Sequence, residues 1–112
     1  MTGPLEISTG RAAALQDDED AVILDVREPY ERAAGHIPGS IHIPLDELGR
    51  RAGELDPATP IVVVCRAGMR SLYAAQALQA AGYDAVSMAG GLLAWDGEQR
   101  PLDPPGGVVA EH

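Results

Sequence analysis

The segment Ile61-Val62-Val63-Val64-Cys65-Arg66-Ala67-Gly68-Met69-Arg70-Ser71 joins an apolar run to a helical stretch. The run, Ile61–Cys65, is continuous rather than alternating, which is typical of a strand buried on both faces of a parallel sheet. The stretch that follows, Ser71–Ala81, is rich in alanine and predicts a helix with Ser71 as its N-cap and Gly82 after its end. A strand, a tight loop that begins at the single cysteine, and a helix therefore follow one another directly.

The same alternation of elements extends in both directions from this segment. Two further apolar runs, Ala21–Val26 and Ala85–Met88, predict strands. The helices expected between strands cover Gly10–Gln16 with a cap at Ser8 or Thr9, Pro29–Ala34, and Pro44–Leu55. Repeated strand–helix units predict an α/β fold, an open parallel sheet covered by helices. We expect one domain over residues 1–100 and a tail, residues 101–112, whose Pro- and Gly-rich sequence frays.

Composition excludes several classes of function. The 112 residues carry a net charge of −9, which disfavours binding to nucleic acid or to an anionic membrane. All eight basic residues are arginine, so neither a Schiff-base lysine nor a phosphate-binding Walker lysine is available. One cysteine and three histidines, none at metal-ligand spacing, predict no disulfide, no structural metal site and no cofactor.

The expected cell compartment and oligomeric state depend mainly on sequence features that do not occur here. The N-terminal residues have neither the basic nor the apolar region of a signal peptide. A free thiol suits a reducing compartment, so we expect a cytoplasmic protein. No heptad or long amphipathic surface occurs, and a monomer is the default. The acidic run Asp17–Asp20 is expected to end the first helix in contact with solvent.

Cys65 lies where a protein can activate a nucleophile. A tight loop between a strand and a helix N-terminus turns backbone N–H groups inward and forms an anion-binding nest. Gly68 permits a positive φ angle, and Arg66 and Arg70 could each bind an oxyanion. Helix N-termini and cations stabilise thiolates. A lone cysteine is often only a small apolar side chain, but this arrangement favours a reactive one.

The loop also limits the kind of reaction. It contains no His, Asp or Glu that could act as a local general base. Sulfur transfer meets that condition, because a thiolate attacks a sulfane sulfur and sulfite leaves as an anion.

Four short motifs follow one another along the chain. They are Asp25-Val26-Arg27-Glu28 with Tyr30-Glu31, Gly35-His36-Ile37-Pro38-Gly39-Ser40, Cys65-Arg66-Ala67-Gly68-Met69-Arg70-Ser71, and Gly90-Gly91-Leu92-Leu93-Ala94-Trp95. In this order they resemble the signatures of single-domain rhodaneses, and the resemblance runs from about Pro4 to Arg100. Each motif alone is weakly specific, whereas the four in order are strongly so.

The resemblance implies a five-stranded parallel sheet with helices on both faces, and a sulfurtransferase reaction. Cys65 is expected to take the outer sulfur from a small anionic donor such as thiosulfate and to become a persulfide. It then passes the sulfur to cyanide or to a thiol, which can belong to another protein. The expected substrate-binding residues form the loop: Arg66, Ala67, Gly68, Met69, Arg70 and Ser71. Within it, Arg66 and Arg70 would attract the sulfonate end of the donor, and Met69 at the pocket mouth would influence which donor enters.

The other motif residues are expected to have structural roles. Asp25 and Arg27 are expected to form an ion pair that fixes the neighbouring loop, with a direct substrate contact by Arg27 as the less favoured alternative. His36 and His42 are expected to bond backbone groups. Trp95 is expected to anchor packing.

Two other classes of function remain as alternatives. Some phosphatases share this fold, but their loop is Cys-x5-Arg. Here the spacing from Cys65 to Arg70 is Cys-x4-Arg, which crowds a tetrahedral phosphoryl group. The second alternative is a regulatory binding module, or a persulfide carrier without turnover, whose sulfur must leave to a second molecule because no second thiol is present.

Overall fold

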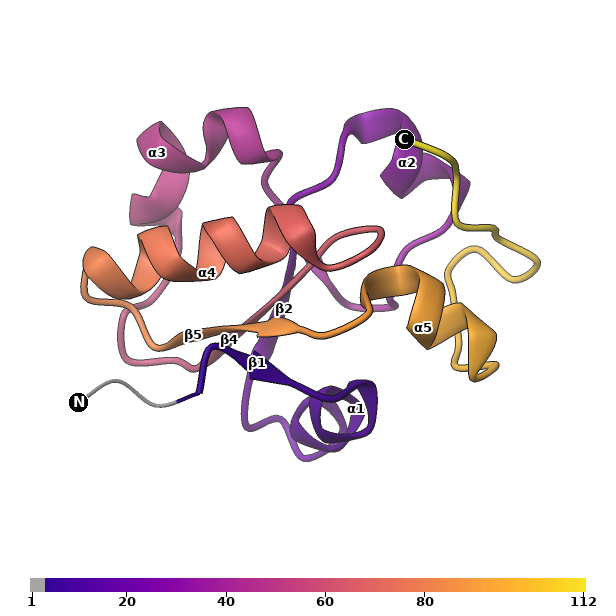
Figure 1. Cartoon of the computed structure of the whole chain (residues 1–112), viewed down its shortest axis with the longest axis horizontal. Coiled ribbons are helices and arrows are strands. Elements are labelled where there is room, and N and C mark those ends of the chain that lie inside the picture. The colour runs from indigo at the N-terminus through magenta and orange to yellow at the C-terminus, as the bar shows by residue number, and fades with distance from the viewer. Residues whose placement is uncertain (1–3) are drawn as a thin grey trace.

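Strands and helices alternate along the chain in the computed structural model, which describes residues 4–112 (Figure 1). The strands are β1 (Glu6–Ile7), β2 (Val22–Asp25), β3 (Ile41–His42), β4 (Ile61–Val64) and β5 (Ala85–Met88). The α-helices are α1 (Thr9–Asp17), α2 (Pro29–Ala34), α3 (Leu48–Arg51), α4 (Met69–Ala80) and α5 (Gly91–Gly97). Two 3₁₀ turns, η1 (Leu45–Glu47) and η2 (Ala52–Glu54), flank α3.

The strands form one parallel sheet in the order β1-β5-β4-β2-β3. The three apolar runs became its central strands, and the predicted α/β fold with a five-stranded parallel sheet is confirmed. The register places Leu24 beside Val63 and Val63 beside Ser87. In a parallel sheet the carboxyl ends of the strands share one edge, so the loops after β2, β4 and β5 meet there.

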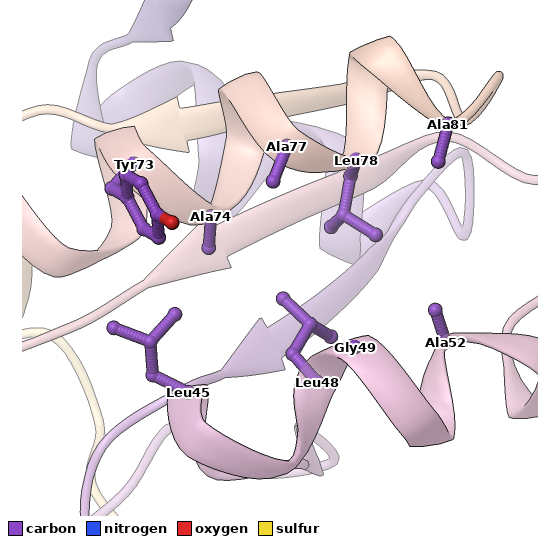
Figure 2. Close-up of a pocket in the computed structure, with 9 residues that line it drawn as sticks. All are labelled: Leu45, Leu48, Gly49, Ala52, Tyr73, Ala74, Ala77, Leu78 and Ala81. Carbon is purple, nitrogen blue, oxygen red and sulfur yellow. The ribbon is translucent and has the colours of Figure 1, made fainter.

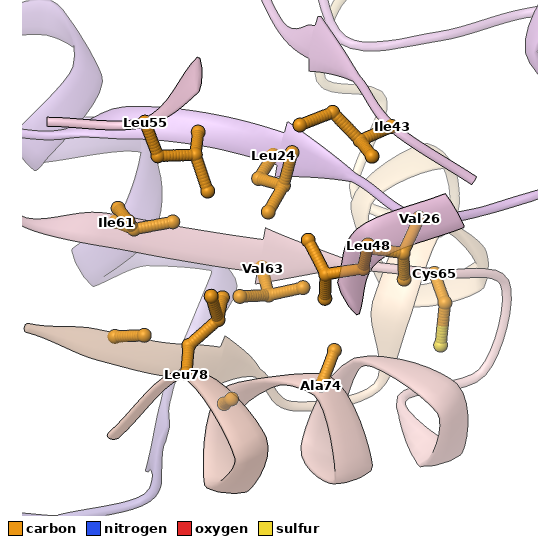
Figure 3. Packing of buried hydrophobic residues seen from close by; sticks show 12 residues of the cluster. Leu24, Val26, Ile43, Leu48, Leu55, Ile61, Val63, Cys65, Ala74 and Leu78 are labelled. Atoms are coloured by element: carbon orange, nitrogen blue, oxygen red, sulfur yellow. The ribbon is translucent and has the colours of Figure 1, made fainter. Parts of the chain in front are cut away.

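Alternation along β4 divides the core between the two faces of the sheet. Ile61, Val63 and Cys65 face α3 and α4, as Figure 3 shows for one cluster of buried side chains. Val62 and Val64 face the opposite side, with Trp95 and Leu92 of α5 and Ala12 of α1. The helices therefore cover both faces, as predicted.

Two predicted helices differ in the structure. The helix expected over Pro44–Leu55 is divided into η1, α3 and η2. Gly49 and Gly53 fall inside it, and each glycine costs a helix about 1 kcal/mol relative to alanine. The helix expected to begin at Ser71 instead begins at Met69, after the left-handed Gly68. The prediction of a Ser8 cap is confirmed, since its side chain accepts a hydrogen bond from Arg11 N at 3.0 Å.

The tail was expected to fray, but the structure holds it by hydrogen bonds. Asp103 and His36 exchange two backbone hydrogen bonds of 2.8 and 3.0 Å, and Val108 N donates to Ala34 O at 2.9 Å. Trp95 Nε1 donates to Pro101 O at 2.8 Å. Figure 1 shows the yellow tail leaving α5 and ending beside α2. The tail therefore returns to the edge of the sheet that carries Cys65.

The longest helix is α4, with 12 residues. Among residues 4–112, no helix has both the length and the apolar character needed to cross a membrane.

Candidate active site

Cys65 directly follows β4, and its sulfur is turned toward the loop that leads into α4 (Figure 3). Its Sγ accepts hydrogen bonds from the backbone N–H groups of Gly68 at 3.1 Å and of Ser71 at 3.3 Å. The residue is only 1% exposed. The loop thus curls around the sulfur and directs two peptide dipoles at it, as expected of an anion-binding nest.

Glycines give the loop this shape from two sides. Gly68 has φ +104°, a conformation that side chains with a Cβ avoid. Behind the loop, Gly91 has φ +60°, and a Cβ there would lie 2.6 Å from the Cys65 carbonyl oxygen. The first turn of α5 donates to the outward-facing carbonyls, from Leu92 N to Cys65 O at 2.8 Å and from Leu93 N to Arg66 O at 3.0 Å. With its carbonyls held outward, the loop turns N–H groups inward.

A pair of buried hydroxyl groups lies under the sulfur. The Cys65 thiol donates to Ser71 Oγ at 3.4 Å, and Ser71 Oγ is 2.7 Å from Ser87 Oγ. Both serines are fully buried. Because a hydroxyl can both donate and accept, Ser87 can donate to Ser71 while Ser71 donates to a thiolate.

Arg70 is held by a carboxylate beside the loop. Its Nη1 and Nη2 donate to the two oxygens of Glu31 at 2.8 and 2.9 Å, and Glu31 is fully buried. Burial raises the pKa of Glu31, but the hydrogen bonds from Arg70 and the Glu28 backbone, together with the positive charge of Arg70, outweigh burial and lower the pKa. This pair ties α2 to the start of α4.

Cys65 lines a pocket of about 240 Å³. The other lining residues are Arg66, Ala67, Met69, Arg70 and His112. Met69 is 75% exposed and lies at the rim of this pocket. Arg66 and Arg70 thus lie on the same pocket as the sulfur. Arg66 Nε also donates to Ala110 O of the tail at 3.2 Å.

The first motif is held together by buried side-chain contacts. Arg27 and Asp25 are both buried and form a two-pronged ion pair, with Nε to Oδ1 at 3.0 Å and Nη2 to Oδ2 at 2.8 Å. Arg27 Nη2 also donates to Gly35 O at 2.8 Å. His42 Nε2 lies 2.8 Å from Arg27 O, and His36 Nδ1 lies 3.1 Å from the Arg32 carbonyl oxygen. Arg27 does not line the Cys65 pocket.

A second pocket of about 250 Å³ lies between α4 and the segment from η1 to η2 (Figure 2). Its walls are leucine and alanine side chains with Gly49 and Tyr73, and it contains no cysteine, serine or charged side chain. Within the described part of the chain, no three His, Cys, Asp or Glu residues gather as metal ligands. The pocket at Cys65 is therefore the candidate site.

Comparisons with known proteins agree with this arrangement. Residues 8–98 match the model of the family described as "Rhodanese-like domain". The chain belongs to the rhodanese family. It is 37% identical to YtwF of Bacillus subtilis over 101 residues, which are 87% of this chain and 98% of that protein. It is 41% identical to thiosulfate sulfurtransferase GlpE of Pseudoalteromonas translucida over 91 residues, 80% of this chain and 87% of that one.

Solved structures lead to the same family. The crystal structure of a rhodanese-related protein from Thermoplasma volcanium superposes with a TM-score of 0.78 at 35% identity, covering 87% of this chain and 95% of that one. The predicted family is thus confirmed, and the chain is an enzyme of the rhodanese type, a sulfurtransferase.

Three residues at this rhodanese site were not predicted from the sequence. Glu31 belongs to the first motif, and that position was the signal that could have indicated a role at the site. Nothing in the sequence, however, pairs it with Arg70. Ser87 reads only as a small residue in an apolar strand. His112 lies in the tail, which the sequence suggested was frayed.

Proposed function

We propose that this rhodanese carries sulfur as a persulfide on Cys65, from thiosulfate or a related persulfide donor to a thiol or cyanide acceptor. One observation supports this above the others. The Cys65 sulfur accepts two backbone N–H bonds in a loop without an acid or base, and it lies on a pocket with two arginines. Such a site stabilises anionic sulfur and attracts an anionic donor.

The reaction has two displacement steps. In the first, the Cys65 thiolate attacks the outer sulfur of thiosulfate, and a new S–S bond forms at Sγ. The S–S bond of thiosulfate breaks, and sulfite leaves with its electron pair. In the second, a thiolate or cyanide attacks the outer sulfur of the persulfide, and Cys65 leaves as a thiolate. Neither step needs a metal, a redox cofactor or a proton from the loop.

Each loop residue has an assigned role in this proposal. The N–H groups of Gly68 and Ser71, now directed at Sγ, hold the charge of the persulfide together with the other free N–H groups at the start of α4. Arg66 and Arg70 face the sulfonate end of the donor. Ala67 and Met69 form the apolar wall and rim of the pocket. Asp25 and Arg27 fix the neighbouring segment through their ion pair and Gly35 O, without touching substrate.

A phosphatase reaction is disfavoured by the same geometry. The loop closes around the sulfur itself, with Gly68 N at 3.1 Å. The spacing from Cys65 to Arg70 is Cys-x4-Arg, a loop too short to wrap a tetrahedral phosphoryl group. We place the reaction in the reducing cytoplasm, where a free thiol persists.

Intact mass spectrometry tests the proposal. The protein is incubated with thiosulfate, desalted, and compared with the Cys65→Ser variant treated in the same way. We expect a gain of one sulfur atom that cyanide removes and that the variant lacks. Sulfur transfer by Cys65→Ser would refute the mechanism. No gain with thiosulfate, but a gain from a persulfidated protein, would reassign the chain as a carrier.

A further inference from the structure

The segment Val108–His112, which we call the strap, lies along the mouth of the Cys65 pocket. Val108 N donates to Ala34 O at 2.9 Å, at the end of α2. Arg66 Nε donates to Ala110 O, and Tyr30 Oη donates to Glu111 O, each at 3.2 Å. His112 then lines the pocket itself. The strap lies outside the residues matched by the rhodanese family model, which end at 98.

A glycine makes room for the strap. A Cβ at Gly35 would lie 2.6 Å from Val108 O and 2.8 Å from Val108 N, distances that real contacts do not reach. The φ of Gly35 is 171°, an extended conformation open to any residue. The position therefore needs glycine because the strap passes over it, and not because of its own backbone conformation. Val109 packs against the buried cluster around Trp95.

The strap restricts what reaches the sulfur. With His112 in its wall, the pocket measures about 240 Å³, below the roughly 300–1,000 Å³ of sites for drug-sized ligands. Cys65 is 1% exposed beneath it. Thiosulfate and cyanide are small enough for such a space, whereas a thiol on a peptide or protein brings bulk that meets the strap.

We propose that the strap determines which acceptors take sulfur from Cys65: small ions enter while it is in place, and a bulky thiol reacts only when it lifts. The contacts that hold the strap thereby set the preference between the two acceptor classes. This inference rests on the sulfur transfer proposed above.

Alkylation of Cys65 tests access without any sulfur transfer. Cys65 is the single cysteine, so the rates of N-ethylmaleimide and of N-(1-pyrenyl)maleimide report on one thiol with one reactive group and two sizes. We expect the small reagent to react much faster with the unaltered protein. Gly35→Ala, which pushes Val108 away, should lower the ratio of the N-ethylmaleimide rate to the pyrenylmaleimide rate at least about tenfold. Tyr30→Phe, which removes one exposed hydrogen bond, should narrow it about threefold.

Matched controls separate access from general loosening. Gly97→Ala adds a Cβ where nothing lies within 4 Å, and Tyr73→Phe removes a hydroxyl from an exposed tyrosine on α4. Both should leave the ratio unchanged. An unchanged ratio in a folded Gly35→Ala protein would overturn the proposal. If that variant does not fold, an unchanged ratio in Tyr30→Phe has the same consequence.

Turnover then connects access to acceptor choice. With thiosulfate as donor, kcat/KM for glutathione relative to cyanide should rise in Gly35→Ala by the factor seen in alkylation. A narrowed alkylation ratio with unchanged acceptor preference would refute the strap as a determinant of specificity. Failure to form a persulfide in the mass experiment would refute the proposed function instead, and the alkylation result would still decide whether the strap controls access.

Discussion

Replacing Glu31 with glutamine tests whether its pairing with Arg70 holds α2 against the Cys65 loop. Glu31 is fully buried and accepts bonds from Arg70 Nη1, Arg70 Nη2 and Glu28 N at 2.8, 2.9 and 3.0 Å. Glutamine keeps the shape but loses the charge. Breaking a fully buried pair costs about 3–5 kcal/mol. Because the Arg70 side chain is 21% exposed, water recovers part of that cost, and we expect a loss of about 2 kcal/mol.

Differential scanning calorimetry measures this loss. For 112 residues, an unfolding entropy of about 2.1 cal/mol/K per residue converts about 2 kcal/mol into a fall in Tm of about 8 °C at neutral pH. Glu6→Gln is the control, since Glu6 is an exposed carboxylate at the start of β1. Its Tm should stay within about 1 °C of the unaltered protein.

The pH dependence gives a second check on the same pair. Burial raises the pKa of Glu31, but the Arg70 and Glu28 hydrogen bonds and the Arg70 charge lower it below the ordinary value of 4.5. A carboxylate with a lowered folded-state pKa stabilises the fold above its unfolded pKa, and that stability is lost as the pH falls through the folded pKa. The Tm gap between the unaltered protein and Glu31→Gln should therefore shrink below about pH 4.5. A gap below about 2 °C at neutral pH, or one that widens in acid, would refute the reasoning.

Three further substitutions test the loop and its supports. Arg70→Ala should lower kcat/KM for thiosulfate about tenfold, through loss of a cation beside Cys65; an unchanged value removes Arg70 from the donor site. Ser87→Ala should slow sulfite release in a single turnover about fivefold, which corresponds to one hydrogen bond of about 1 kcal/mol, and an unchanged rate means that the hydroxyl pair does not act on the sulfur. Gly91→Ala should lower the free energy of unfolding by about 3 kcal/mol in denaturant titration, whereas Gly97→Ala should not lower it.

The parts of the fold that could be predicted have strong local signals. Ile61–Cys65 is apolar throughout and Ala85–Met88 nearly so, because both faces of the central strands are covered, and the pattern alone indicates this. The bounds of the helix Pro29–Ala34 were predicted correctly because Pro29 is favoured in the first turn of a helix and Gly35 ends it. The Cys65 loop could be located because a strand end, a glycine and two arginines all fall within a few residues.

The parts that could not be predicted depend on contacts distant in sequence. Strands β1 and β3 have two residues each, too few to show a period. The pairing of Arg70 with Glu31 joins residues 39 positions apart. Ser71 looked like an N-cap, but its hydroxyl lies between Sγ and Ser87, and Gly68 is the N-cap of the helix instead. In each case the structure depends on tertiary contacts that the local sequence does not show.

In the proposed mechanism, recognition of an anionic donor depends more on local geometry than on net charge. The protein carries a net charge of −9, so its long-range field repels an anionic donor. The charge of Arg70 is largely balanced by Glu31, while Arg66 is bound to a neutral carbonyl and keeps its full charge. In the proposed mechanism the donor is attracted by Arg66, by Arg70 to the smaller extent that Glu31 leaves, and by peptide N–H groups, whose dipoles act only at short range. Those dipoles point at the sulfur because Gly68 and Gly91 allow the loop to curl, so in the proposed mechanism the two glycines contribute to donor binding through the shape of the loop.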